Sequence, residues 1–151
     1  MKKKKDLLIL KGQLANQTYN GLENRIQLFD GKYTTGYRVK EIRICPSAPQ
    51  NQEEVLCVVS TEPLSAVPSS FDFSSNTNVA YVCWNAPNQT EHSEWKLIIR
   101  DNMAIEDLWI GVYSTGDETL INYYMELEKW EFPAWTGAGI LVENISQAGP
   151  Q

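Results

Sequence analysis

In residues 120–132, LINYYMELEKWEF, every second position from Ile121 to Leu127 is apolar or aromatic. A strand places successive side chains on opposite faces of a sheet, so this period of two predicts a long strand with one buried face. The predicted buried row is Ile121, Tyr123, Met125 and Leu127. The predicted exposed row is Asn122, Tyr124, Glu126, Glu128 and Trp130.

Shorter runs of apolar and β-branched residues surround this stretch and read as further strands. They cover residues 7–14, 25–29, 37–45, 54–61, 79–84, 95–103, 108–114 and 140–145. Prolines interrupt most windows that are long enough for a helix. About eight or nine short strands with turns between them predict an all-β fold, an antiparallel β-sandwich of jelly-roll type.

Turn residues separate the predicted strands. Asp30-Gly31 lies between residues 25–29 and 32–34 and predicts a tight hairpin, because glycine adopts the positive φ that such turns need. Residues 115–118, TGDE, predict a second antiparallel connection, into the strand at 120–132. Residues 63–78 are rich in serine, proline and asparagine and predict a long exposed loop.

A length of 151 residues with 42% hydrophobic residues predicts one globular domain, residues 1–151. We expect a short basic N-terminal arm at about residues 1–5 and a flexible C-terminal tail at about residues 146–151. The apolar run Leu7–Leu10 is too short for a secretory signal, and no stretch is long enough to cross a membrane. The sequence therefore predicts synthesis in a cytoplasm and no contact with a membrane.

Charge is distributed unevenly along the chain. The net charge is −6, but residues 1–45 carry ten Lys and Arg against four Asp and Glu, and residues 46–151 carry three against fifteen. The acidic excess argues against general binding of nucleic acid. If the two parts formed different faces, copies of the chain would attract one another head to tail.

The sequence contains no recognisable catalytic motif. His92 is the only histidine and lies in a polar stretch, which favours an exposed loop over a general base. The cysteines Cys45, Cys57 and Cys83 lack the spacing of a zinc site, and their apolar surroundings predict buried free thiols. We expect no enzymatic activity, no metal and no cofactor.

Two surfaces remain as candidates for binding. Glu126 and Glu128 project from the same face of their strand, next to Trp130, and Trp135 follows the break at Phe132-Pro133. These five residues predict either an interface between copies or a platform for a ligand such as a carbohydrate on a host surface. The second candidate is the basic arm Lys2, Lys3, Lys4 and Lys5, which predicts weak contact with nucleic acid.

The last third of the chain resembles small uncharacterised virion structural proteins of marine bacteriophages. The residues that carry the resemblance are 108–113 (LWIGVY), 121–128 (INYYMELE) and 132–139 (FPAWTGAG). The resemblance implies a β-sandwich coat, minor capsid or decoration subunit of a virion, without cofactor or catalysis. Its partners would be copies of itself or other virion proteins, and Lys2 to Lys5 would face the genome. A carbohydrate or host-surface binding module is the alternative function.

Overall fold

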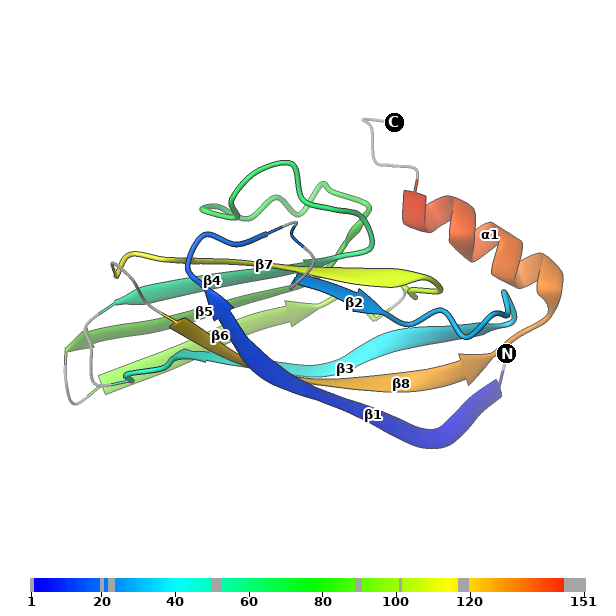
Figure 1. The fold of residues 1–151 in the computed structure, drawn as a ribbon, viewed down its shortest axis with the longest axis horizontal. Helices are drawn as coiled ribbons and strands as arrows, with labels where there is room; N and C mark the ends of the chain where they lie inside the picture. The colour runs from blue at the N-terminus through cyan, green and yellow to red at the C-terminus, as the bar shows by residue number, and fades with distance from the viewer. Residues whose placement is uncertain are drawn as a thin grey trace.

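The computed structural model describes residues 2–19, 21, 24–49, 53–88, 91–100, 102–116 and 120–145. In this part of the chain, eight strands form two antiparallel sheets that face each other, and one helix lies at an end of the sandwich (Figure 1). The predicted all-β sandwich is therefore confirmed.

The first sheet has β8 in its centre and the second has β4 in its centre. In pairing order, the first sheet contains β1 (Lys2–Ala15), β8 (Leu120–Glu131) and β3 (Thr35–Pro46). The second contains β2 (Arg25–Gln27), β7 (Asp107–Ser114), β4 (Glu54–Ser60), β5 (Asn78–Asn88) and β6 (Glu91–Ile98). The jelly-roll type stays a prediction.

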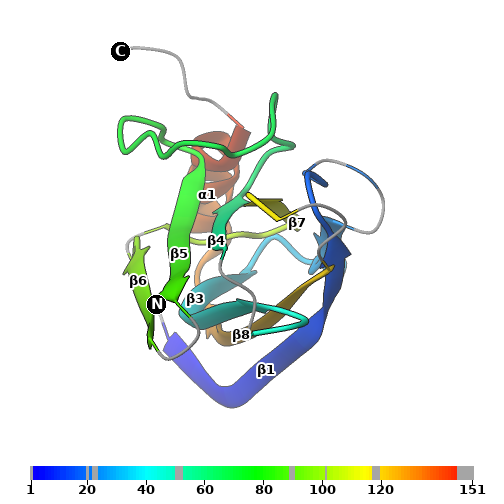
Figure 2. The same ribbon diagram turned by 90° about the vertical axis from the view of Figure 1, so that its left-hand side faces the viewer.

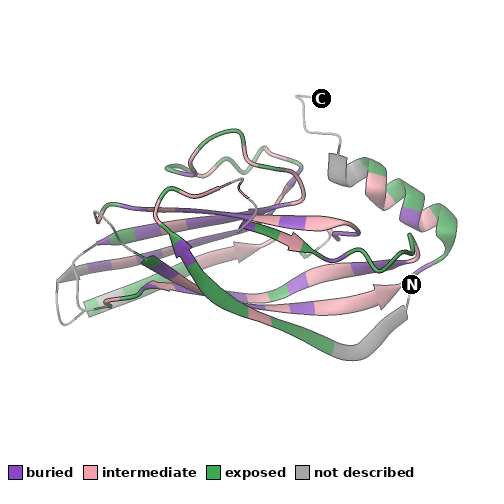
Figure 3. Cartoon of the chain, in the orientation of Figure 1, coloured by how far each residue is buried: buried purple, intermediate pink, exposed green. Residues whose placement is uncertain are grey.

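The main core lies between the two sheets. Ile121, Met125 and Leu127 of β8 are completely buried, as the alternation of residues 120–132 predicts. The facing side chains of the second sheet include Val55, Cys57, Val59, Val82, Ile110 and Val112. Figure 3 shows these buried positions as purple segments on the strands. Burial raises the pKa of the Cys57 thiol to about 12, as expected for a thiol in an apolar interior.

The turn at Asp30-Gly31 is present, but the predicted hairpin is wrong. Gly31 has a φ of 90°, and the Asp30 carboxylate accepts a hydrogen bond of 2.9 Å from the backbone N–H of Lys32. However, β2 pairs with β7 in the second sheet and β3 pairs with β8 in the first. The turn therefore carries the chain from one sheet to the other.

Residues 115–118 lie between the end of β7 and the start of β8 as predicted, but the predicted antiparallel pairing of these two strands is wrong. Strand β7 pairs with β2 and β4, whereas β8 pairs with β1 and β3, so these two strands also belong to opposite sheets. By contrast, the consecutive strands β5 and β6 pair with each other in the second sheet. His92 lies in β6, so its predicted position in a loop is wrong, and its side chain lies outside the described residues.

Residues 140–145, predicted as a strand, are part of helix α1 (Ala134–Ile145), and this prediction is wrong. The helix follows Pro133, whose C=O accepts a hydrogen bond of 3.1 Å from Gly137 N–H. Its inner side places Ile140 and Leu141 on a second small core, which contains Met103, Ile105 and Phe132. Gly137, which is also buried, precedes Ile140 and Leu141 by three and four positions, the spacing of residues that share one face of a helix.

The N-terminal end of the chain differs from the expected arm. Lys2 to Lys5 belong to β1, where the backbones of Lys2 and Lys3 pair with Glu131 and Trp130, while their side chains lie outside the described residues. The predicted tail at residues 146–151 also lies outside them. Within the part of the chain that the structure describes, no helix has the length and apolar character needed to cross a membrane.

Candidate functional site

The outer face of the first sheet carries the exposed row of β8 that the sequence predicts. Tyr124 donates a hydrogen bond of 2.8 Å to Glu126 Oε2, and Trp130 Nε1 donates one of 3.3 Å to Glu128 Oε2. The hydrogen bond to Glu126 is the main reason why the pKa of Tyr124 is raised. Glu126 and Glu128 thus share a face as predicted, and each carboxylate accepts a hydrogen bond from a neighbouring aromatic residue.

Basic strands flank this acidic row. In the register of the first sheet, Arg38 of β3 lies opposite Glu128, and its guanidinium is 4.8 Å from the centre of the Trp130 ring. Lys40, Arg43 and Arg100 line the same open depression as Glu126 and Glu128. The acidic row of β8 therefore lies between β1 and β3, two strands from the basic part of the sequence. The expected head-to-tail attraction between copies stays a prediction.

The aromatic residues of the predicted platform do not share one environment. Trp130 is half-buried against the second core, and Phe132 is part of that core with 5% of its surface exposed. Trp135, on helix α1, is 79% exposed. The prediction of Phe132 as a surface residue is wrong, because its ring supports the helix. The carbohydrate hypothesis therefore loses the group of residues on which the sequence placed it.

Strand β1 forms an open edge of the first sheet. It pairs with β8 along one side, and no other described strand pairs with its second side. Leu7 and Ile9 lie on the outer face opposite Glu128 and Glu126, and they are 40% and 53% exposed. Leu8 lies on the inner face and is still 37% exposed. An edge with apolar side chains exposed on both faces is a template for strand addition.

The facing strand explains why Leu8 is not covered. Strand β3, one edge of the first sheet, packs against β4, β5 and β6 of the second sheet. The opposite edge strand of the first sheet, β1, therefore lies on the same side of the sandwich as β2 (Figure 2). Strand β2 has only three residues, whereas β1 has fourteen. Strand β2 is therefore too short to cover most of the inner face of β1.

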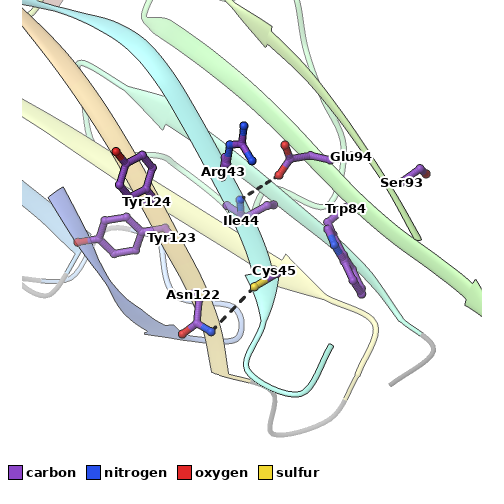
Figure 4. Close-up of a pocket in the computed structure, with 9 residues that line it drawn as sticks. All are labelled: Arg43, Ile44, Cys45, Trp84, Ser93, Glu94, Asn122, Tyr123 and Tyr124. Carbon is purple, nitrogen blue, oxygen red and sulfur yellow. Dashed lines mark hydrogen bonds between the residues drawn. The ribbon is translucent and has the colours of Figure 1, made fainter. Parts of the chain in front are cut away.

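The other edge of the first sheet is closed by side chains from β6. Glu94 Oε2 accepts a hydrogen bond of 3.2 Å from the backbone N–H of Ile44, and Lys96 Nζ donates one of 2.9 Å to the C=O of Ile42. Lys96 also forms ion pairs with Glu41, at 2.5 Å, and with Glu94, at 3.1 Å. Figure 4 shows the bond between Ile44 and Glu94 at the margin of a pocket between the sheets. The two edges of the sheet are therefore unequal.

This closed edge makes the stability of the protein depend on pH. The hydrogen bond from Lys96 is the main reason why the pKa of Glu41 is lowered, although burial opposes it. A lowered pKa stabilises the fold at neutral pH, and the contribution is lost as the pH falls from about 5 to below that pKa. We expect Lys96→Met to reduce the free energy of unfolding by about 1–2 kcal/mol at neutral pH, and by less at about pH 3.

Urea unfolding of wild type and Lys96→Met at both pH values measures this effect. Lys32→Met is the matched control, because Lys32 is exposed in the loop before β3 and its removal changes the net charge equally. The control should change stability by less than about 0.5 kcal/mol. A loss in Lys96→Met that is the same at both pH values would contradict the role of the Glu41 pair.

The sequence signal for the open edge is the run Leu7 to Leu10. Four consecutive apolar residues in a strand place apolar side chains on both faces, which suits a strand covered on both faces. In a sandwich of two layers, no further layer covers the outer face of a sheet. Apolar side chains on that face therefore indicate a surface for contact with another molecule.

Comparison of the chain with known protein families, with curated proteins and with solved structures found no match. Among the described side chains, no cluster of three or more His, Cys, Asp or Glu residues has the geometry to hold a metal ion. The open edge of β1 is the most distinctive feature of the candidate site.

Proposed function

We propose that this protein is a non-enzymatic structural subunit that acts by self-assembly, as a coat, minor capsid or decoration protein of a virion. The observation that carries the proposal is the contrast between the two edges of the first sheet. Side chains of β6 close the β3 edge, whereas the β1 edge exposes Leu7, Leu8 and Ile9. Natural proteins usually protect an edge strand, so an open apolar edge supports a role in association.

The partner that fits this edge is a second copy of β1. Pairing would add backbone hydrogen bonds and would bury Leu7, Leu8 and Ile9, each of which contributes about 1 kcal/mol when its exposed part is covered. The basic residues Lys2 to Lys5 lie at one end of the strand. Antiparallel pairing places this block beside the uncharged residues 12–15 of the other copy, while parallel pairing would place two basic blocks together. A two-fold symmetric dimer is therefore favoured.

The mass of the protein in solution, measured by light scattering over a range of protein concentrations, tests this proposal. We expect wild type to associate, and Ile9→Lys to weaken the association at least about tenfold, because a lysine on an edge opposes pairing. Val142→Lys is the control, since Val142 is a similarly exposed apolar residue on helix α1. Circular dichroism confirms that each variant is folded.

Three outcomes separate the alternatives. A wild type that stays monomeric up to about 1 mM would contradict self-assembly through any surface. If Ile9→Lys associates like wild type while Val142→Lys does not, the helix rather than β1 forms the interface. For the virion role, the decisive observation is electron microscopy of assembled particles: Lys2 to Lys5 should lie inside, near the genome, and their location on the outer surface would overturn that part of the proposal.

A further inference from the structure

A second exposed feature lies on the outer face of the second sheet, away from β1. The loop of residues 61–77 crosses this face and brings Phe71 and Phe73 next to Tyr81 of β5 and Trp95 of β6 (Figure 1). Phe73 is 59% exposed and Trp95 is 49% exposed. The planes of these two rings differ by 18°, and their centres are 6.1 Å apart. We call Phe71, Phe73 and Trp95 the aromatic platform.

The platform is held in place by groups beneath and between its rings. Tyr81 is buried below it and contacts Phe71 and Phe73 edge-on, at 5.3 Å and 4.8 Å between ring centres. The Tyr81 hydroxyl donates a hydrogen bond of 2.5 Å to the C=O of Asp72, which lies between the two phenylalanines. The free protein therefore already has the rings in position, which reduces the entropy lost on binding a ligand.

Asp72, between Phe71 and Phe73 in the sequence, carries an exposed carboxylate. Asp72 Oδ1 accepts hydrogen bonds from the N–H and the hydroxyl of Ser74, at 3.0 Å and 2.6 Å. These bonds lower the pKa of Asp72, so its side chain is ionised at neutral pH. A carboxylate has about four positions for accepting hydrogen bonds, and Ser74 occupies two of them. The remaining positions can accept hydrogen bonds from hydroxyl groups of a ligand.

We propose that the aromatic platform is a binding site for a neutral carbohydrate, with a sugar ring stacked on Phe73 and Trp95 and a sugar hydroxyl bound by Asp72. The C–H groups on one face of a pyranose carry partial positive charge, which the negative face of an aromatic ring attracts. Ser70 and Ser74, both exposed on the same loop, carry further hydroxyl groups that can form hydrogen bonds.

Size and charge favour a sugar over other partners. The exposed parts of Phe73 and Trp95 together offer roughly 200 Å², whereas a stable protein interface needs about 800 Å² from each partner. Nucleobases also stack on aromatic rings. However, ionised Asp72 lies in the acidic part of the chain, where residues 46–151 carry fifteen acidic and three basic residues, and a phosphate backbone would be repelled.

Titration calorimetry with maltohexaose, cellohexaose and chitohexaose tests the site. We expect at least one of these oligosaccharides to bind with a Kd of about 1 mM or tighter. Trp95→Ala and Phe73→Ala should each weaken that binding at least about tenfold, because each removes one stacking surface. Trp95→Tyr should retain most of the affinity, since it keeps an aromatic ring.

The matched control is Trp135→Ala, which removes an even more exposed tryptophan from helix α1 and should leave binding unchanged. Ile9→Lys should also bind normally, because β1 lies on the other sheet, and this variant separates the sugar site from self-assembly. Absence of binding for all three oligosaccharides at about 10 mM would overturn the proposal, as would full binding by a folded Trp95→Ala. Binding of an oligothymidylate through Trp95 in place of the sugars would identify nucleic acid as the ligand instead.

Discussion

Gly137→Ala is expected to lower the free energy of unfolding by about 2 kcal/mol and to release helix α1 from the sandwich. An added Cβ at position 137 would lie 1.7 Å from the carbonyl oxygen of Tyr33 and 3.2 Å from the ring of Phe132. The contact is with backbone, so no side-chain rotation relieves it. Ile140 and Leu141 would move away from the second core together with the helix. The higher helix propensity of alanine offsets only about 1 kcal/mol of this cost.

Gly139→Ala provides the control within the same helix. A Cβ at position 139 meets no atom within 4 Å, so the substitution should stabilise the protein by about 0.5–1 kcal/mol through helix propensity alone. Urea unfolding gives both free energies, and amide hydrogen exchange of residues 134–142 reports whether the helix is docked. If the two alanine variants changed stability in the same direction, the close approach of α1 to Tyr33 would be contradicted.

Side-chain periodicity was enough to predict most of the strands. The alternation in residues 120–132 depends only on which side chains face the core, and the structure buries Ile121, Met125 and Leu127 as this pattern requires. The runs at residues 54–61 and 79–84 likewise form β4 and β5, which are central or nearly central in the second sheet. The pattern that marks the buried face of a strand lies within a few consecutive residues, so it can be recognised in a single sequence.

Strand partners could not be predicted in the same way. Asp30-Gly31 has the conformation that the sequence indicates, but a turn does not specify whether the chain returns to its own sheet or crosses to the other. Here β3 pairs with β8, more than seventy residues away, because that pairing covers Val39 and Ile42 with the facing sheet. Long-range burial therefore outweighed the local preference for a hairpin.

The helix and the candidate sites show two further limits. Residues 140–145 are apolar enough for a strand, and only the surface formed by Met103, Ile105 and Phe132 determines that they form one side of a helix. The aromatic platform joins residues of a loop with Trp95, about twenty residues later, and the sequence alone does not place them together. The open edge at Leu7 to Leu10 had a local signal, but its meaning depends on the short length of β2.

Leu127→Ala is expected to cause the largest loss of stability, about 3–4 kcal/mol, because it removes a completely buried side chain from the central strand of the first sheet. Leu127 lies between Leu8 of β1 and Val39 of β3, so a cavity at this position weakens the contact of all three strands with the second sheet. A small domain has only about 5–15 kcal/mol of stability in total, and the variant would unfold at clearly lower urea concentration.

Leu120→Ala removes the same atoms from the same strand, at a position that is 44% exposed, and should cost less than about 1 kcal/mol. Urea unfolding gives the loss in free energy of unfolding for each variant. Because the substitution is the same, the difference between the two losses measures the effect of burial. Equal losses would mean that the second sheet does not pack over β8. The exposure of Leu8 would then no longer follow from the short β2, because the rest of the inner face would be uncovered as well.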